Sequence, residues 1–172
     1  MSSSGPHRLC RGAVGERDQG PLAAMPSATI AVASEEEVRA GTLGRLLREF
    51  NYERVGRYPE GQGVYLNAKD ERGNLLGGFR GEIYFHWLFI NVLFVEESQR
   101  RKGLGTRLLA EGEAGAIAKG ALHARLETFE WQAPGFYLKH GYRELARMPG
   151  YYQRYSLSLM VKELSRAKDR SP

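Results

Sequence analysis

A nearly continuous apolar run at residues 87–95 leads, within a few positions, into the basic and glycine-containing segment 100–106, and a helical pattern follows immediately. The run is rich in β-forming residues and is interrupted only by Asn91, which predicts a central strand covered on both faces. Across residues 104–119, large apolar and small residues recur on one helical face. A buried strand, a basic turn and a helix in this order constrain the chain to an α/β fold.

The turn between this strand and this helix has the chemistry of an anion site. Gly103 and Gly105 allow a ligand to approach the backbone closely, and a helix N-terminus presents unpaired N–H groups and partial positive charge. Arg100, Arg101 and Lys102 add positive charge, which suits a diphosphate with a further phosphate nearby. The segment lacks the Lys-Ser/Thr pair of a nucleotide triphosphatase loop and the third glycine of a dinucleotide fingerprint. A basic turn that binds no ligand is the alternative at this point.

The remaining pattern places further strands and helices around this segment. Ser34 and Glu37 form a capping-box pair that opens a helix after the first strand, and Pro134 marks the start of a short helix. The last two strands are expected to form a hairpin around a turn at residues 148–150, and residues 51–63 are expected to be a loop, with a short helix within it as the alternative. The two strands that flank the helix after the basic turn are expected to be parallel. Strands other than the central one are expected at residues 29–33, 64–68, 75–84, 124–129, 142–147 and 152–161.

Length and composition indicate one domain with short tails. The 172 residues, 42% of them hydrophobic, suffice for one core, which is expected to span residues 29–164. Residues 1–28 are rich in Ser, Gly, Pro and Arg without periodicity and are predicted to be a disordered tail, and residues 165–172 a short polar tail. The first tail lacks the apolar centre of a secretory signal, and Met25 is an alternative start. No run approaches the roughly 20 apolar residues of a membrane-spanning helix, so a cytoplasmic protein without a membrane partner is expected.

Cysteine content and charge argue against several classes of function. Cys10 is the single cysteine, so neither an intrachain disulfide nor a cysteine-rich metal site is expected. The four histidines show no metal-ligand spacing, and no bound metal is predicted. The net charge of +5 arises from 25 basic and 20 acidic residues without a dense basic stripe, so nucleic acid is not an expected partner.

Two ordered motifs carry a resemblance to a known family. Val95, Arg100, Gly103 and Gly105 form V-x-x-x-x-R-x-x-G-x-G at the end of the long strand, and the block APGFYLKHGY at residues 133–142 follows one strand later. Together they resemble the coenzyme A motifs of the GNAT superfamily of N-acetyltransferases, in particular members of the Q-A-P-G-F-Y type. The resemblance covers the chain from about residue 29 to residue 164.

The resemblance implies both a fold and a co-substrate. The implied fold is a mixed, mostly antiparallel central sheet with flanking helices, whose parallel strand pair splays apart to admit the pantetheine arm of coenzyme A. The implied co-substrate is acetyl-coenzyme A, and Tyr137 is implied to protonate the departing thiolate, as a phenol within hydrogen-bond reach is able to do. The residues implied to bind the co-substrate are Leu93, Phe94, Val95, Arg100, Arg101, Lys102, Gly103, Leu104, Gly105, Thr106 and Tyr137.

The group that removes a proton from the acceptor is less constrained. The resemblance implies a glutamate on the strands that face the acceptor; Glu82 is the predicted base, and His86, Glu127 and Glu130 are the other candidates. Because Cys10 lies in the predicted tail, no cysteine nucleophile is expected, and transfer is expected to be direct within a ternary complex. Several aromatic residues have two possible roles, which are to line an acceptor pocket or to pack in the sheet and core. These residues are Phe85, Trp87, Phe89, Trp131, Tyr151, Tyr152 and Tyr155.

The resemblance implies acetyl transfer to a primary amine, and the lack of an added recognition domain favours a small-molecule acceptor. A protein N-terminus or a lysine is the alternative acceptor, and a monomer or homodimer is expected. A non-catalytic acyl-coenzyme A-binding module is a further alternative, because Glu130 stands where many members have Asn, and Asn91 where close relatives often have Asp. The presence of Tyr137 favours the enzyme.

Overall fold

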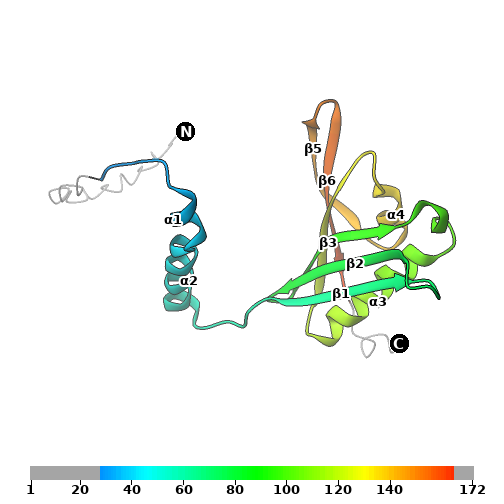
Figure 1. Cartoon of the computed structure of the whole chain (residues 1–172), viewed down its shortest axis with the longest axis horizontal. Helices are drawn as coiled ribbons and strands as arrows, with labels where there is room; N and C mark the ends of the chain where they lie inside the picture. The colour runs from blue at the N-terminus through cyan, green and yellow to red at the C-terminus, as the bar shows by residue number, and fades with distance from the viewer. Residues whose placement is uncertain (1–27, 165–172) are drawn as a thin grey trace, which may run out of the picture. The chain divides into compact units, whose positions relative to one another are not determined.

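The structure, a computed structural model, describes residues 28–164, which form one unit that ends at Phe50 and a second that begins at Asn51. Figure 1 shows both, coloured along the chain. The predicted tails lie outside the described residues except for Ala28, and so does Cys10. No helix in the described part of the chain combines the length and the apolar character needed to cross a membrane.

The first unit is helical, and its predicted start is confirmed. The Ser34 side chain accepts a hydrogen bond from the backbone N–H of Glu37, whose carboxylate accepts one from the backbone N–H of Ser34. This capping box begins α1 (Glu35–Arg39), the chain turns at Gly41 with a φ of 65°, and α2 (Thr42–Val55) follows. The capping signal therefore marks the boundary correctly because it is local in sequence.

Two predictions around this unit are wrong. The strand predicted for residues 29–33 is absent, because these exposed residues pair with none of the described strands. A strand without a neighbour leaves its backbone groups without sheet partners and is marginal in water. The loop predicted for residues 51–63 begins too early, since α2 continues to Val55. Its last turn includes Tyr52 and Val55, which the aperiodic composition of the segment concealed.

The second unit contains a six-stranded sheet in the order β1-β2-β3-β4-β6-β5. Every neighbouring pair is antiparallel except β3 and β4, which are parallel. This confirms the predicted mixed, mostly antiparallel sheet with a single parallel pair. The strands are β1 (Gln62–Lys69), β2 (Leu75–Tyr84), β3 (Trp87–Val95), β4 (His123–Phe129), β5 (Arg143–Tyr152) and β6 (Tyr155–Glu163).

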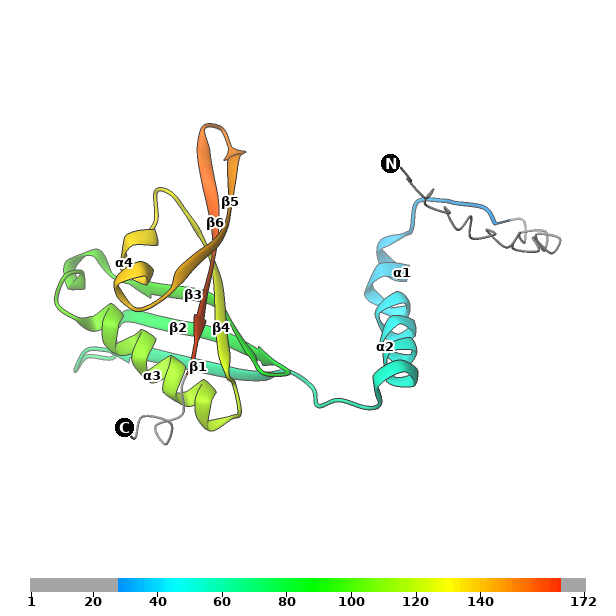
Figure 2. The same cartoon turned by 180° about the vertical axis from the view of Figure 1, so that it is seen from behind.

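The two parallel strands pair over only part of their length. Pairing runs from Trp87 opposite His123 to Ile90 opposite Leu126, and it ends there. Beyond that point β3 continues to pair with β2, and β4 continues to pair with β6, so the two strands diverge (Figure 2). We call this boundary between β3 and β4 the seam. Its open half leaves the β3 backbone at residues 91–95 without a strand partner on the β4 side, as the resemblance implied.

Two helices of the second unit position the open half of the seam. A short 3₁₀ turn, η1 (Glu97–Gln99), follows β3 and leads to α3 (Leu104–Ala118), which packs on one face of the sheet, whereas α4 (Pro134–Lys139) follows β4 (Figures 1 and 2). Gly112 permits close packing of α3, because a Cβ there would lie 2.7 Å from the ring of the fully buried Phe79. The helical face predicted from the sequence is buried as expected. The middle of α3 is thereby packed closely against β2.

The final hairpin turns later than predicted. Residues 148–150 belong to β5, and the turn lies at residues 153–154, with Gln153 at a φ of 51°. The register shifts between Met148 and Tyr152, so a bulge accommodates Pro149 and Gly150, whose φ is 63°. β5 is an edge strand, where the missing N–H of proline costs no ladder hydrogen bond. The Pro-Gly signal therefore marks a bulge instead of a turn.

A partly buried ionic cluster joins α3 to β6 and to the residue that precedes β5. Glu113 on α3 accepts a hydrogen bond from the Tyr142 hydroxyl at 2.9 Å and forms an ion pair with Lys162 on β6 at 2.6 Å. Burial, and after it the charge of Glu113, raises the pKa of Tyr142 far above its ordinary value, so its hydroxyl stays a donor. One carboxylate thus holds together three segments that are distant in sequence.

Glu113→Ala is expected to lower the free energy of unfolding by about 3 kcal/mol, because Lys162 and Tyr142 both lose a partly buried acceptor. Urea unfolding of the purified protein measures the change. Glu111→Ala on the same helix is the matched control, since its pair with Arg107 spans 3.8 Å between exposed side chains and contributes about 0.5 kcal/mol or less. Equal losses in the two variants would contradict the assigned role of Glu113.

Candidate functional site

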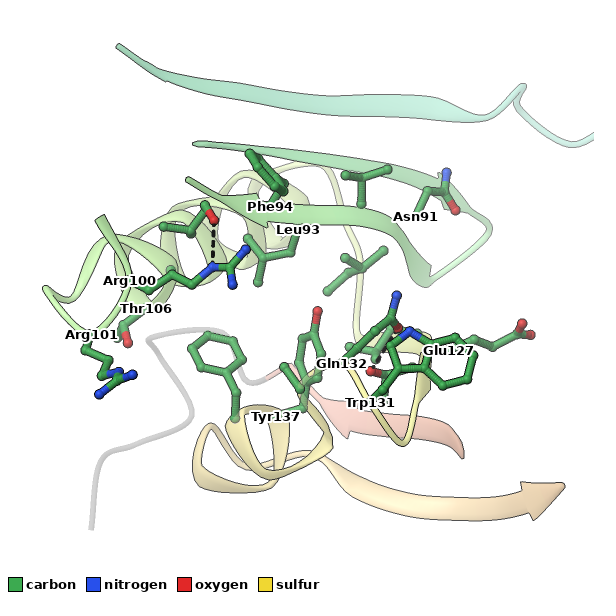
Figure 3. A pocket seen from close by; sticks show the side chains of 18 of the residues that line it. Asn91, Leu93, Phe94, Arg100, Arg101, Thr106, Glu127, Trp131, Gln132 and Tyr137 are labelled. Carbon is green, nitrogen blue, oxygen red and sulfur yellow. Dashed lines mark hydrogen bonds between the residues drawn. The ribbon is translucent and has the colours of Figure 1, made fainter. Parts of the chain in front are cut away.

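A cavity of about 1020 Å³ lies at the open half of the seam. Its walls come from the end of β3, the turn after it, the start of α3, the end of β4 and the start of α4. In Figure 3, Arg100, Arg101 and Thr106 lie at one end, Asn91 and Trp131 at the other, and Tyr137 between them. The cavity is therefore elongated along the unpaired edge of β3, with a basic end and a distant aromatic end.

The basic end is a turn with an unusual backbone. Arg101 has a φ of 60° and Gly103, the N-cap of α3, a φ of 84°, so two residues close together are in the left-handed region. Lys102 between them does not have a positive φ, so left-handed and other conformations alternate along the turn. A turn of this kind points successive N–H groups into one concavity that suits an anion. The Nε of Arg100 donates a hydrogen bond to the Val95 carbonyl at 3.1 Å and ties the turn to the end of β3. The side chain of Arg100 thus connects the predicted phosphate-type turn to β3.

Most of the residues predicted for this end do line the cavity, but two do not. Lys102 and Leu104 are absent from the lining, whereas the other predicted residues contribute to it. Lys102 is exposed and Leu104 is half-buried as the first residue of α3. Their roles in binding stay predictions. The residues from the predicted set that line the cavity are Leu93, Phe94, Val95, Arg100, Arg101, Gly103, Gly105, Thr106 and Tyr137.

The second glycine of the turn keeps the cavity open. A Cβ placed on Gly105 would lie 3.5 Å from Val95 and 3.6 Å from Phe136, which are ordinary contact distances. The protein itself would therefore tolerate a side chain at this position. Because Val95, Phe136 and Gly105 all line the cavity, a larger side chain would extend into the space that a ligand needs. This glycine is explained by the cavity and not by the packing of the fold.

Sequence reasoning missed the contact between Thr106 and His140. The Oγ1 of Thr106 lies 3.0 Å from Nε2 of His140, whose Nδ1 lies 2.7 Å from the carbonyl oxygen of Phe136. Since a carbonyl only accepts, Nδ1 carries a proton, and in the neutral ring Nε2 accepts from the Thr106 hydroxyl. The ring thereby orients a hydroxyl at the start of α3. The available signal was the i, i+4 spacing of Phe136 and His140 in the APGFYLKHGY block.

Tyr137 is held between β3 and β4 by α4. Its side chain is 8% exposed and packs against the rings of Phe136 and Tyr142, with centroids 5.2 and 5.6 Å away. Figure 3 shows its hydroxyl pointing into the cavity, toward the side of Leu93. Burial raises the pKa of Tyr137 above its ordinary value, so the phenol retains its proton and is able to donate it to an anion formed in the cavity.

The four candidate bases lie in different surroundings. Glu127 lines the cavity, and it is the only carboxylate among the described residues of the lining. Glu82 does not line it and accepts a hydrogen bond from the Tyr84 hydroxyl at 2.9 Å, so its predicted role as base stays a prediction. His86 Nδ1 lies 3.3 Å from the carbonyl of Gly120, and the Glu130 carboxylate accepts from the backbone N–H of Ser156 at 3.3 Å; neither lines the cavity.

Gln132, the first residue of the Q-A-P-G-F-Y motif, has a structural role that sequence reasoning did not assign. Its Oε1 accepts hydrogen bonds from the backbone N–H of Phe129 at 2.9 Å and from the Thr128 hydroxyl at 3.3 Å. Its own backbone N–H donates to the Phe129 carbonyl at 2.9 Å, which closes a tight turn after β4. Trp131 is in this turn, so its ring is held at the far end of the cavity. Within residues 28–164, no group of three or more His, Cys, Asp or Glu side chains is suited to a metal ion.

Comparisons of sequence point to one enzyme family. Residues 27–142 match the family described as acetyltransferase (GNAT). The blasticidin-S acetyltransferase of Streptomyces morookaense is 43% identical over 98 residues, which are 56% of this chain and 72% of that protein. The match includes more than half of the chain.

Comparisons of structure agree. An acetyltransferase from Bacillus cereus has a TM-score of 0.71 at 32% identity, over 80% of this chain and 98% of that one. An aminoglycoside 6′-N-acetyltransferase in complex with coenzyme A has a TM-score of 0.54 at 20% identity, over 75% of this chain and 92% of that one. At that level of identity the second likeness concerns the fold.

Proposed function

Since this chain belongs to the acetyltransferase (GNAT) family, we propose that it transfers an acetyl group from acetyl-coenzyme A to a primary amine of a small molecule. The observation that carries the proposal is the continuous cavity that runs from the basic turn, along the unpaired edge of β3, to the Tyr137 hydroxyl. It provides, in order, a place for phosphates, a place for an extended amide-containing arm, and a proton donor.

The residues present fit acetyl-coenzyme A. The left-handed turn at Arg101 and Gly103, together with the start of α3, suits the pyrophosphate. The backbone at residues 91–95, which lacks a strand partner on the β4 side, suits the amides of the pantetheine arm. The absence of a side chain on Gly105 leaves room between Val95 and Phe136.

Acetyl-coenzyme A would supply an acetyl group activated as a thioester. Transfer forms a C–N bond, breaks the C–S bond and leaves a thiolate that requires a proton, while the amine must lose one. Tyr137 is the proposed donor, because its buried hydroxyl points into the cavity and keeps its proton at neutral pH. The attack is proposed to be direct, since no cysteine is among the described residues that line the cavity.

The proposed base is Glu127. A base must reach the amine directly or through one water, and Glu127 provides the carboxylate among the described residues of the lining. In Figure 3 this carboxylate points away from Tyr137, so the role requires a bridging water or a turn of the side chain. Glu82 remains the alternative that the family resemblance implied. Its carboxylate accepts a hydrogen bond from the Tyr84 hydroxyl.

A small-molecule acceptor is supported by the relative that is 43% identical and is named for acetylation of blasticidin S. A protein N-terminus or a lysine is the alternative acceptor. The expected monomer or homodimer and the cytoplasmic location stay predictions.

Release of free thiol from acetyl-coenzyme A in the presence of a panel of primary amines tests the proposal. Release that depends on an amine, with the acetylated product found by mass spectrometry, is the expected result. Binding of coenzyme A without release would instead indicate a non-catalytic acyl-coenzyme A-binding module, and absence of binding would refute both. Peptides with free N-termini and lysines in the same panel distinguish the two classes of acceptor.

A further inference from the structure

Trp131 lines the end of the cavity opposite the basic turn and packs against aromatic side chains that lie outside the lining. The ring of Trp131 stacks on Phe129 with centroids 4.3 Å apart and planes 8° from parallel. Tyr155 and Tyr152 meet Trp131 edge-on, at 4.9 and 6.1 Å. This cluster joins the turn after β4 to the β5–β6 hairpin. We call Trp131 and these three neighbours the aromatic cluster.

Hydrogen bonds fix the turn that contains Trp131, and the side chain of Trp131 is nevertheless partly exposed. Gln132 fixes the turn that contains Trp131 through hydrogen bonds to the Phe129 N–H and the Thr128 hydroxyl. Trp131 is nevertheless 48% exposed and lines the cavity, and Tyr152 is 58% exposed. A large aromatic side chain that is held in place but left half-exposed in a cavity is more typical of a binding surface than of a core.

Charge differs between the two ends of the cavity. Among the described residues of the lining, Arg100 and Arg101 are at the basic end and Glu127 is at the end that contains Trp131. Arg154 lies against the ring of Tyr155 in the hairpin, but it does not line the cavity. In Figure 3, Glu127 and Trp131 lie on the side of the cavity opposite Arg101, with Asn91 across from them on β3. A cationic molecule is therefore favoured at the aromatic end and disfavoured at the basic end.

Resting on the proposed function, we propose that the acceptor is a cationic amine that also carries a flat unsaturated ring, and that Trp131 selects it by stacking. Indole is the best of the aromatic side chains both for stacking and for contact with a cation, and Glu127 adds charge complementarity. The flat ring lies against Trp131, while the reacting amine extends toward Tyr137. Trp131 is thus a specificity-determining residue, and the chemistry itself stays with Tyr137.

Pairs of amines that differ only in flatness test this inference. In 2-phenylethylamine and 2-cyclohexylethylamine the linker is the same and the ring has the same number of carbons, and further such pairs extend the panel. With the wild-type protein, the flat member of each pair is expected to have a kcat/KM about tenfold higher. Trp131→Leu is expected to abolish this preference, and Trp131→Phe to keep most of it.

Trp87→Leu is the matched control, since the chain has two tryptophans and Trp87 stacks on His123 without lining the cavity. It is expected to retain the preference, and all variants are expected to keep the affinity for coenzyme A. Equal kcat/KM for flat and saturated amines, or a preference that persists in Trp131→Leu, would overturn the inference while leaving acetyl transfer intact.

A binding measurement separates this inference from the proposed function. Trp87→Phe leaves Trp131 as the tryptophan reporter, and its fluorescence is followed while coenzyme A-saturated protein is titrated with each amine. Tighter binding of the flat amines supports the stacking role even if no thiol is released with any acceptor. Equal binding of both members of each pair contradicts it. Thiol release alone decides the proposed acetyl transfer.

Discussion

Tyr137→Phe is expected to lower kcat by about a hundredfold or more, because positioned proton donors contribute roughly that much to a rate. The phenol is buried against Phe136 and Tyr142, and these contacts involve its ring, so phenylalanine preserves them. The dissociation constant of coenzyme A is therefore expected to change by less than about twofold, since a single neutral hydrogen bond contributes little. Steady-state kinetics and calorimetric titration measure the two quantities separately.

Two observations would speak against this role. An unchanged kcat would remove Tyr137 as the acid, and a large loss of coenzyme A affinity would make it a binding residue. The pH dependence adds an independent check. Burial raises the pKa of Tyr137, and an acid works in its protonated form, so its contribution is lost only as pH rises through that raised value. A decline in kcat that begins near neutral pH must then come from another group.

Gly105→Leu is expected to raise the dissociation constant of coenzyme A about a hundredfold. The added side chain would keep the diphosphate from its backbone contacts, and the binding free energy would weaken by about 3 kcal/mol. The added side chain would extend past Val95 and Phe136 into the cavity. The melting temperature of the ligand-free protein is expected to stay nearly constant, since the first added atom meets only ordinary contacts.

Gly44→Leu provides the matched comparison for this prediction. It makes the same change within another helix, at a position where an added Cβ meets nothing within 4 Å. It is expected to leave coenzyme A binding unchanged. Similar affinities for Gly105→Leu and Gly44→Leu would refute the placement of the phosphates at the start of α3. A large fall in the stability of Gly105→Leu would show instead that Gly105 serves the packing of the fold.

The central part of the site was predictable because its signals are local. The apolar strand, the two spaced glycines and the helical face after them occupy one continuous segment, and each has a strong conformational meaning by itself. The parallel pairing of β3 and β4 followed from the intervening helix. The position of Tyr137 was implied by the spacing of the two motifs, and the structure places its side chain in the cavity.

What the sequence did not reveal depends on geometry between distant residues. Thr106 and His140 are 34 positions apart, and only the packing of α4 against the start of α3 brings them to 3.0 Å. Lys102 belongs to the same basic turn as Arg100 and Arg101, yet it does not line the cavity, and its role in binding stays a prediction. Proline and glycine at residues 149–150 marked irregular backbone correctly, but whether that becomes a turn or a bulge depends on the partner strand.

The seam has a consequence for the mechanics of the sheet. The set β1, β2 and β3 shares hydrogen bonds with the set β4, β6 and β5 at one end only, where pairing stops at Ile90 and Leu126. At the other end, coenzyme A bound as proposed would take the place of the missing strand contacts. The ligand would then be a structural member of the sheet, and amide hydrogen exchange at residues 91–95 is expected to slow as the cavity fills. Cohesion between the two sets of strands would depend on the concentration of the ligand as well as on the chain.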